Sequence, residues 1–394
     1  MNIDSVDFFY ASMPSVTYDA DGSQDTLLVR VRSGSDEGWG ECEASPLTSI
    51  AAFVTPRSHG VCQPVADSVL GERLDSVDDI ARIAALVRRN SMDLLQAPHT
   101  FSGIEIALWD LLGRRLGEPV WRLLGGRRAY PKVPYASMLF GATAQQTLDA
   151  VKSAADAGFR AVKVGWGTFG QGSVDADADQ LAAAREGLGS DGFLLVDAGQ
   201  IWVDDVAAAA QRLPALEAAG ATWIEEPFLP LAYRAHAELA GRSGTVGVAG
   251  GEGAHSVHMA TNLIDYADVR FVQIDTGRIG GIGPAKAVAD YAAARDIAFV
   301  NHTFTSQLAL SASLQPFAAL PDHRICEFPL TPSELARKIT AGRLELVDGE
   351  LLPLDAPGLG LDVELEAIRP YLHDVEISID GHALYAGEHF GGTR

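Results

Sequence analysis

The sequence is poor in several features that mark particular classes of protein. It has only three cysteines, Cys42, Cys62 and Cys326, which are widely spaced and form no CxxC pattern. That spacing argues against a disulfide framework or a zinc knuckle and favours reduced thiols in the cytoplasm. Basic residues are also scarce, because 30 Lys and Arg stand against 52 Asp and Glu, a formal net charge of −22. Nucleic-acid binding needs the opposite balance, since Lys and Arg neutralise the phosphates.

Signals for membranes and export are missing as well. No apolar run reaches the length of a transmembrane helix, and the start, MNIDSVDFFY, has no basic region followed by an apolar one. The apolar fraction of 47% and the charged fraction of 21% are typical of a globular protein, and 394 residues favour two domains over one. We therefore expect a cytoplasmic protein of enzyme size, with neither nucleic acid nor a membrane as its partner.

From about residue 130 the chain alternates short β-rich runs with Ala- and Leu-rich stretches of helical spacing. The runs are VPYASM (133–138), AVKVGW (161–166), FLLVDAG (193–199), TWIEEP (222–227), VGVAGGE (246–252), VRFVQID (269–275), AFVNHT (298–303) and RICEFP (324–329). Eight such units favour a parallel βα barrel, with an open doubly wound sheet as the alternative. No GxGxxG motif follows a first strand, so a dinucleotide-binding fold has little support.

The flanking segments differ from this pattern. Residues 1–128 have the character of a separate α+β domain, and its candidate elements are the strands 25–33 and 38–43 and the helices 78–90 and 103–117. The barrel then occupies 129–354. Residues 355–394 do not form a ninth barrel unit, and we expect them to return to the first domain. Their tail predicts a short hairpin with Asp380-Gly381 as its turn.

Most of the predicted barrel strands carry a polar residue at or near the end. These residues are Lys163, Asp197, Glu225, Glu252, Asp275, His302 and Glu327, and neighbours in this series are 23 to 34 residues apart. Each gap is about one βα unit, so a barrel would place the series around its C-terminal face, where barrel active sites lie. A single acid at a strand end is usually a helix N-cap or a solvated loop residue. A series of seven at one repeat period indicates a functional site instead.

Three consecutive strands finish at Asp197, Glu225 and Glu252. Clustered carboxylates repel one another and do not all stay ionised without a partner. A divalent cation resolves the repulsion, and a purely oxygen ligand set with room for water and substrate favours Mg²⁺. Glu226 follows Glu225 and, in an alternating strand, points the other way. We therefore interpret Glu226 as a supporting carboxylate rather than as a ligand.

Asp275 and His302 end neighbouring strands. A carboxylate beside an imidazole fixes its tautomer and raises its proton affinity, which suits general acid–base catalysis. A buried structural histidine is the alternative for His302 taken by itself. Lys163, on the other side, would place positive charge near the cation. We interpret His255 as a loop or helix residue, although it lies close to Glu252 in the sequence.

At these residues the sequence resembles the mandelate racemase-like subgroup of the enolase superfamily. The resemblance covers almost the whole chain, and it is carried by GWGECEASP (38–46), SGIEIALWDLLGRRLGEPVWRLLGG (102–126), AVKVGW, VDAGQIW (196–202), WIEEPF (223–228), GGEGAH (250–255), QIDTGRIGG (273–281), VNHTF (300–304) and CEFP (326–329). It implies a modified TIM barrel, (β/α)₇β, with an α+β capping domain built from both ends of the chain. It also implies that Asp197, Glu225 and Glu252 hold Mg²⁺ and that Asp275 and His302 form the catalytic dyad. Glu327 would hydrogen-bond the substrate carboxylate or its enolate.

The sequence departs from this family pattern on the second barrel strand. Racemases of the subgroup carry K-x-K there, whereas this chain has Lys163-Val164-Gly165-Trp166. Glycine cannot move a proton, which argues against two-base racemisation, and Lys163 matches the lysine that polarises the carboxylate in the family. A milder departure is Gly199, where the family often has asparagine. One base, His302, suits β-elimination, so the resemblance points to a dehydratase of a 2R acid sugar, an aldonate or an aldarate, with a 2-keto-3-deoxy acid as product.

Candidate substrate contacts lie in the capping loops near 14–24 and 45–62 and at the barrel mouth. They are Tyr18, Asp19, Trp166 and Arg278, and a solvated loop is the alternative for the first two. Other functions remain open: a racemase, an epimerase or a cycloisomerase of the same superfamily, or an inactive homologue that acts as a binding protein. The resemblance also implies a homo-oligomer, from dimer to octamer.

Overall fold

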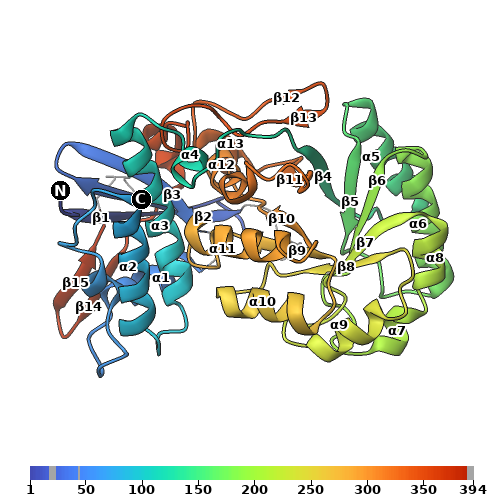
Figure 1. Cartoon of the computed structure of the whole chain (residues 1–394), viewed down its shortest axis with the longest axis horizontal. Coiled ribbons are helices and arrows are strands. Elements are labelled where there is room, and N and C mark those ends of the chain that lie inside the picture. The colour runs from blue at the N-terminus through green and yellow to red at the C-terminus, as the bar shows by residue number, and fades with distance from the viewer. Residues whose placement is uncertain (17–23, 43–44, 388–394) are drawn as a thin grey trace.

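A computed structural model describes residues 1–16, 24–42 and 45–387. A barrel and a capping body lie side by side along the long axis of the molecule (Figure 1). The cap contains the first strands and helices of the chain together with its last hairpin. Within the described residues, no helix is long and apolar enough to cross a membrane.

The barrel sheet of the described chain has eight strands. They are β4 (Val133–Leu139), β5 (Ala161–Gly165), β6 (Phe193–Asp197), β7 (Ala221–Glu225), β8 (Gly247–Gly250), β9 (Phe271–Asp275), β10 (Ala298–His302) and β11 (Ile325–Pro329). Each pairs in parallel with its neighbour in the order β10-β9-β8-β7-β6-β5-β4-β11. All eight coincide with the predicted runs, to within a few residues at their ends.

Side chains join the two outer strands of this order. The Glu327 backbone N–H on β11 donates to Oδ1 of Asn301 on β10 at 2.9 Å, and the Thr303 N–H donates to Oε2 of Glu327 at 2.7 Å. The sheet therefore closes on itself with β10 beside β11. The predicted modified TIM barrel is confirmed, and the open doubly wound sheet is wrong.

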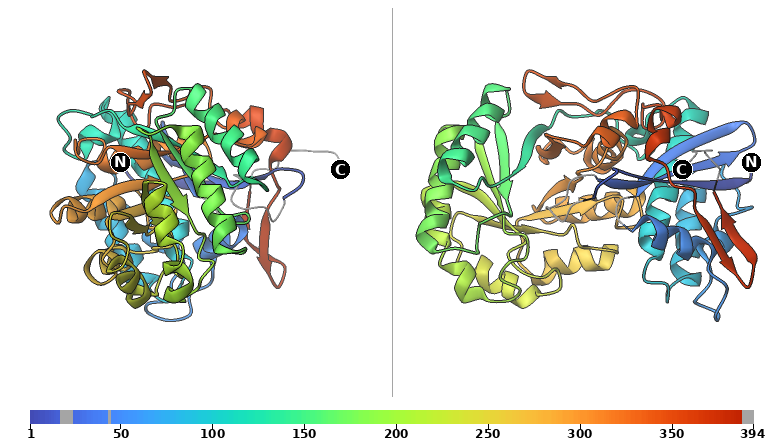
Figure 2. Two further views of the ribbon diagram at one scale, coloured as in Figure 1. Left: turned by 90° about the vertical axis from the view of Figure 1, so that its right-hand side faces the viewer. Right: turned by 180° about the vertical axis from the view of Figure 1, so that it is seen from behind.

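Helices surround the sheet, as the end-on view in Figure 2 shows. They are α5 (Ala144–Asp156), α6 (Val174–Leu188), α7 (Val206–Ala210), α8 (Leu213–Ala218), α9 (Tyr233–Ala240), α10 (Val257–Tyr266), α11 (Ile282–Ala293) and α12 (Gln307–Leu314). Several are preceded by an N-cap residue whose side chain accepts a hydrogen bond from a backbone N–H of the first turn, such as Thr143, Ser173 and Ser256. These N-caps stop the chain cleanly between strand and helix and so keep the strand ends in register.

The cap is built on a three-stranded antiparallel sheet packed against helices. Its elements are β1 (Ser5–Ser12), β2 (Asp25–Ser33), β3 (Asp36–Cys42), α1 (Pro46–Val54), α2 (Val77–Asn90), α3 (Ala97–Leu116) and α4 (Val120–Leu123), with a 3-10 helix at Val65–Ser68. Strand β1 is not among the predicted elements. The predicted loop at 45–62 is wrong in its first part, because Pro46 starts helix α1, whose inner face is buried at Ile50 and Phe53.

The chain after the barrel runs back along the cap. Its elements are α13 (Glu334–Lys338), β12 (Leu346–Val347), β13 (Glu350–Leu351), α14 (Leu365–Ile368), the 3-10 helix Arg369–Tyr371, β14 (Glu376–Ile379) and β15 (His382–Ala386), whereas the 3-10 helix Gln315–Phe317 lies within the barrel, between α12 and β11. The hairpin β14–β15 turns at Asp380 and Gly381, both with positive φ, as predicted. Tyr385 fixes this hairpin to β1, because its hydroxyl donates to the Phe8 carbonyl at 3.1 Å.

Candidate active site

The strand ends bring the predicted site residues to one rim of the barrel. Asp197 and Glu225 are register partners on β6 and β7, and Asp275 and His302 are register partners on β9 and β10. Alternation along a strand turns both members of each pair to the barrel interior. The rim therefore has an acidic side and a side that carries the imidazole.

The imidazole of His302 is buried between two carboxylates. Its Nδ1 lies 2.8 Å from Oδ2 of Asp275, and its Nε2 lies 3.1 Å from Oε2 of Glu252. The Gly277 N–H donates to the other oxygen of Asp275 at 2.6 Å and fixes that carboxylate. Burial acts to lower the pKa of His302, but Glu252, Glu327 and the Asp275 hydrogen bond outweigh it and raise that pKa well above its usual value.

Lys163 lies among carboxylates in the interior. Its Nζ is 2.9 Å from Glu225 Oε1, 3.1 Å from Glu327 Oε1 and 3.5 Å from Asp197 Oδ2. Burial opposes its charge, yet Glu225 and Glu327 raise the pKa of the ammonium well above its usual value. The lysine is therefore a fixed positive charge, in reach of the groups assigned to the cation and of Glu327.

The acids of the rim outnumber its cationic groups. The acids are Asp197, Glu225, Glu226, Glu252, Asp275 and Glu327, and the cationic groups are Lys163, Arg278 and His302. Burial raises the pKa of Glu225 to about 8, with Lys163 opposing this and the neighbouring acids adding to it. Burial acts in the same direction on Glu252, but His302, Arg278 and Lys163 outweigh it and lower its pKa to about 2.

This charge balance and this donor set fit a divalent cation. Asp197, Glu225 and Glu252 offer hard oxygens from three adjacent strands, and a cation would relieve their repulsion. Among the described residues no three ligating side chains converge on one position, because each of these carboxylates is turned to Lys163, His302 or Arg278. Glu226 is held apart from the three, since Gln200 Nε2 donates to its Oε2 at 2.8 Å.

Two glycines shape the rim beside Asp197. A Cβ on Gly165 would lie 2.5 Å from the Asp197 Cβ, so the rim is closed to a side chain at the position of the second family lysine. A Cβ on Gly199 would lie 2.9 Å from the indole of Trp166. The departure from asparagine at 199 therefore makes room for this ring.

The remaining substrate-contact predictions have different outcomes. Trp166 is 39% exposed at the end of β5, and its backbone has a φ of 54°, which is uncommon for a residue other than glycine. Arg278 Nη1 donates to Glu252 Oε1 at 3.0 Å, so it lies at the rim and supports a predicted metal ligand. Tyr18 and Asp19 lie outside the described residues.

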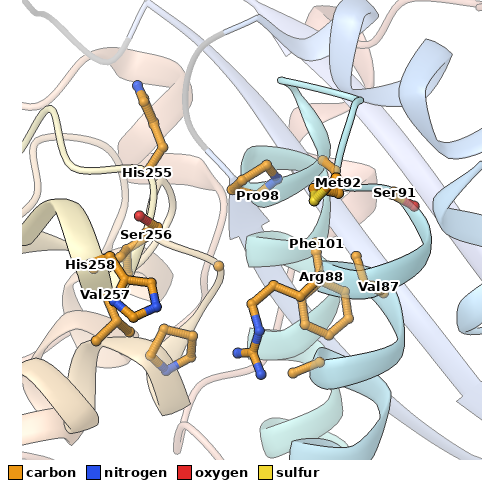
Figure 3. Close-up of a pocket in the computed structure, with 15 residues that line it drawn as sticks. Val87, Arg88, Ser91, Met92, Pro98, Phe101, His255, Ser256, Val257 and His258 are labelled. Atoms are coloured by element: carbon orange, nitrogen blue, oxygen red, sulfur yellow. The ribbon is translucent and has the colours of Figure 1, made fainter. Parts of the chain in front are cut away.

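A separate cavity lies between the cap helices α2 and α3 and the start of α10 (Figure 3). Its volume is about 480 Å³, and Arg88, Met92, Phe101, His255 and His258 contribute to its lining. His255 also meets the cap, since its Nδ1 lies 3.1 Å from Nε2 of His99. The described lining carries no carboxylate side chain and none of the predicted site residues, so we place the candidate active site at the barrel rim.

Two family models match this chain. The model of the mandelate racemase / muconate lactonizing enzyme N-terminal domain matches residues 12–125, and the enolase C-terminal domain-like model matches 146–368, which is more than half of the chain. The chain belongs to the mandelate racemase-like group of the enolase superfamily. Members of this group and this chain share both the capping domain and the barrel.

Individual relatives agree with this membership. A crystal structure described as a predicted mandelate racemase from Rhodobacter sphaeroides is 62% identical, covers 98% of this chain and all of that one, and superposes with a TM-score of 0.95. D-galactarolactone cycloisomerase of Agrobacterium fabrum is 28% identical over 85% of this chain and 87% of its own length. L-talarate/galactarate dehydratase of Salmonella typhimurium is 32% identical over 77% and 73%.

Proposed function

We propose that this protein is a Mg²⁺-dependent dehydratase of an acid sugar, an aldonate or an aldarate. The observation that carries the proposal is the asymmetry of the rim. On one side of the rim, His302 Nδ1 lies 2.8 Å from Asp275 Oδ2. On the other side, Gly165 occupies the position where a second base would stand. The dehydratase named among the relatives supports the same reaction class.

His302 is the base in this proposal. Its Nδ1 faces Asp275, so Nε2 is the nitrogen that accepts the proton from C2 of the acid. The C2 carbanion then shares its charge with the carboxylate. The C3–O bond breaks, and the leaving hydroxide takes the proton that His302 removed and departs as water. The enol that remains becomes a 2-keto-3-deoxy acid. Since His302 acts from one face only, we keep the family expectation of a 2R substrate.

The other residues stabilise the charge that develops on the carboxylate. Mg²⁺, held by Asp197, Glu225 and Glu252, would supply Lewis-acid stabilisation of the enediolate. Lys163 adds a fixed ammonium beside Glu225 and Glu327. Glu327 is held by the Thr303 and Lys163 contacts, and we assign it to hydrogen bonding with the substrate carboxylate. Such prearranged charges in a buried site cost little reorganisation during the reaction.

Trp166 and Arg278 are the proposed contacts to the rest of the acid. Trp166 lies next to Asp197, since its backbone N–H donates to the Asp197 carbonyl at 3.2 Å, and its exposed indole lies beside Gly199. An aromatic face there can pack against the carbon chain of a sugar. Tyr18 and Asp19 in the capping loop remain in the proposal as hydroxyl contacts.

A screen of mono- and di-acid sugars with Mg²⁺, scored by 2-keto acid formation, tests the function. Turnover of one or a few 2R acids is the expected result. Turnover of only 2S acids would contradict the assignment of His302 as base. Exchange of the C2 proton in D₂O without 2-keto acid would point to an epimerase, and neither exchange nor turnover across a broad library would favour the binding-protein alternative.

A cycloisomerase is the second candidate. The observation that favours it is the similarity to a cycloisomerase, whose alignment covers 85% of this chain. The same base on one face can expel a ring oxygen instead of a hydroxide. The two reactions differ in product mass, because a lactone that is opened by elimination keeps all its atoms, whereas dehydration loses one water.

We further propose a homo-oligomer in the cytoplasm, between a dimer and an octamer. Exposed apolar side chains on two loops at the mouth support self-association: Ile201, Val203, Leu229 and Leu231. The loops are joined, because the Leu229 N–H donates to the Val203 carbonyl at 2.9 Å. The free thiols Cys42, Cys62 and Cys326 suit a reducing compartment. Light scattering after size exclusion measures the number of subunits, and a monomer at micromolar concentration would contradict this part.

A further inference from the structure

Gln273 on β9 is a buried polar side chain. Gln273 is 1% exposed, and neither the nitrogen nor the oxygen of its side-chain amide has a hydrogen-bond partner among the described residues. The sequence pattern predicts no functional role for Gln273, because it lies within the β-rich run 269–275. A polar side chain two residues before a catalytic acid, and therefore on the same face, is the signal that would have identified it.

The strand geometry directs Gln273 into the barrel. Phe271, two residues earlier, packs inside the barrel against Trp223 with ring centroids 5.0 Å apart. Asp275, two residues later, meets His302 at the rim. Since side chains on one face recur every second residue, Gln273 lies between these two levels and faces the interior.

Its level in the barrel is that of the Lys163 cluster. Barrel interiors are filled in layers of four side chains that come from alternate strands. β5, β7 and β11 contribute Lys163, Glu225 and Glu327, which are joined through the ammonium at 2.9 and 3.1 Å. β9 is the fourth alternate strand. Glu225 on β7 is the register partner of Ala249 on β8, which is the register partner of Phe271 on β9. A layer of the barrel moves forward by one residue at each strand, so on β9 the layer of Glu225 contains Gln273 rather than Phe271.

A second orphan lies in the same interior. The hydroxyl of Tyr135 on β4 is fully buried and has no partner among the described residues. Lys163 Nζ lies 5.5 Å from the centre of the Tyr135 ring. Burial, followed by the charge of Glu327, raises the pKa of this tyrosine, so its hydroxyl keeps its proton as a donor. Unsatisfied donors and acceptors thus gather around the charged layer.

Two such groups in one barrel interior are costly unless a ligand supplies their hydrogen bonds. Buried polar groups in folded proteins are nearly always hydrogen-bonded, and each exception calls for an explanation. An apolar side chain of the same shape would avoid the cost of desolvating an amide. The layer already holds Glu225, which is assigned to the cation, and Glu327, which is assigned to the acid. An oxygen that these ligands bring in can therefore be the missing partner.

We propose that Gln273 is a further ligand-contacting residue, whose carboxamide hydrogen-bonds an oxygen delivered to the barrel interior by the cation or the acid. With the cation alone this oxygen belongs to a water, and with an acid bound it belongs to the carboxylate. The inference rests on the proposed function in placing both ligands at this rim. It adds a residue of neutral charge to a layer that otherwise consists of one ammonium and two carboxylates.

Calorimetry on Gln273→Leu tests the inference without turnover. Mg²⁺ is titrated first, and oxalate is titrated second at saturating Mg²⁺, because oxalate presents carboxylate oxygens to the cation and has no C2 proton. We expect the dissociation constant for oxalate to rise about tenfold or more, the size typical of a hydrogen bond to a charged group. A matching rise for Mg²⁺ alone would identify the water as the partner, and an unchanged value would identify the carboxylate.

Ser33→Ala is the matched control. Ser33 lies on β2 in the cap sheet and is fully buried, and its hydroxyl has no partner among the residues that the structure describes. Both substitutions remove an unsatisfied group, so both should leave the melting temperature of the ligand-free protein unchanged or raise it. Only Gln273→Leu should weaken ligand binding.

Several results would overturn the inference. Unchanged dissociation constants for both ligands in Gln273→Leu would do so, and a lower melting temperature with unchanged binding would assign a structural role. Gln273→Met, closer in shape, serves if the leucine variant does not fold. Wild-type protein that binds neither Mg²⁺ nor oxalate contradicts both proposals, whereas wild type that binds both but converts no acid contradicts the proposed function alone.

Discussion

Gly165 determines which chemistry the rim allows at the scale of a single residue. It faces the interior beside Asp197, and any Cβ there would meet the Asp197 Cβ at 2.5 Å and the Asp197 carbonyl at 3.0 Å. No contact of a real Cβ is that short, so a side chain at 165 must push a predicted metal ligand. The loss of the second family lysine and the position of Asp197 are therefore one structural feature. A lysine placed here would disturb the predicted cation ligand Asp197 before it could act as a base.

The first prediction follows from this contact. Gly165→Ala should raise the dissociation constant for Mg²⁺ at least about tenfold and lower the free energy of unfolding by about 1–3 kcal/mol, as overpacked sites do. Gly60→Ala is the control, because a Cβ on Gly60 meets nothing within 4 Å. Calorimetry and urea unfolding measure the two quantities. Wild-type Mg²⁺ affinity in Gly165→Ala would show that the rim adapts.

His302 is the second residue whose role can be isolated. His302→Asn removes the proposed base and leaves a smaller polar side chain beside Asp275. We expect kcat to fall about 10³-fold, within the range of general-base contributions, and C2 proton exchange in D₂O to disappear. The Mg²⁺ affinity should stay near that of wild type. His258→Asn, in the separate cavity, is the control, and retained exchange in His302→Asn would show that another group removes the proton.

At the scale of elements, helix α3 of the cap holds the loop that follows Asp275. Glu105 on α3 accepts hydrogen bonds from the Ile282 N–H at 2.7 Å and from the Gly283 N–H at 2.9 Å, at the start of α11. Ser102, one turn earlier, accepts from the Gly280 N–H at 2.8 Å. The cap thus fixes the backbone between Asp275 and α11. The position of Asp275 beside His302 therefore depends on the contact between the cap and the barrel.

Glu105 also gives the fold a pH dependence. Burial raises its pKa from 4.5 to about 7. The native state then binds this proton more tightly than the unfolded state, so the contribution to stability is fully present below about pH 4.5 and is lost as the pH rises to about 7. Relative to Glu105→Gln, the free energy of unfolding of wild type should fall by about 3 kcal/mol across this window. Urea unfolding at several pH values measures it.

The control for this slope is Glu366→Gln on the exposed side of α14. It should leave the pH dependence of wild type unchanged. A constant difference in the free energy of unfolding between wild type and Glu105→Gln at all pH values would mean that Glu105 stays ionised in the native protein.

The sequence predicts the individual strands and helices of the barrel better than the contacts between their side chains. Each barrel strand is a short β-rich run with a polar end and a helical stretch after it, so local pattern alone places β4 to β11 and the predicted rim residues. Side-chain pairing is not local: the contacts of His302 with Glu252 and of Lys163 with Glu327 join distant segments. The left-handed backbone of Trp166 and the missing partner of Gln273 depend on neighbouring strands, which explains why they were not predicted.

At the scale of the whole molecule, Asp110 joins three distant parts of the chain. It is fully buried on α3, where one oxygen accepts from the Trp39 N–H of β3 at 2.9 Å and from Arg114 at 2.8 Å. The other oxygen accepts from the Leu359 N–H at 2.8 Å, in the segment that returns from the barrel. The contacts between distant segments of one chain depend on such buried groups, because each buried backbone N–H that loses its partner stays without a hydrogen bond.

Asp110→Ala should therefore destabilise the protein by about 3–5 kcal/mol, the cost of breaking a buried charged network. Asp362→Ala is the matched control, because Asp362 pairs with the same Arg114 at 2.9 Å but is 80% exposed, and it should cost less than about 1 kcal/mol. The returning segment should also loosen, so limited proteolysis should cut near 355–365 faster in Asp110→Ala than in the control. Equal unfolding free energies in the two variants, measured in urea, would mean that the apolar contacts between barrel and cap hold the returning segment without Asp110.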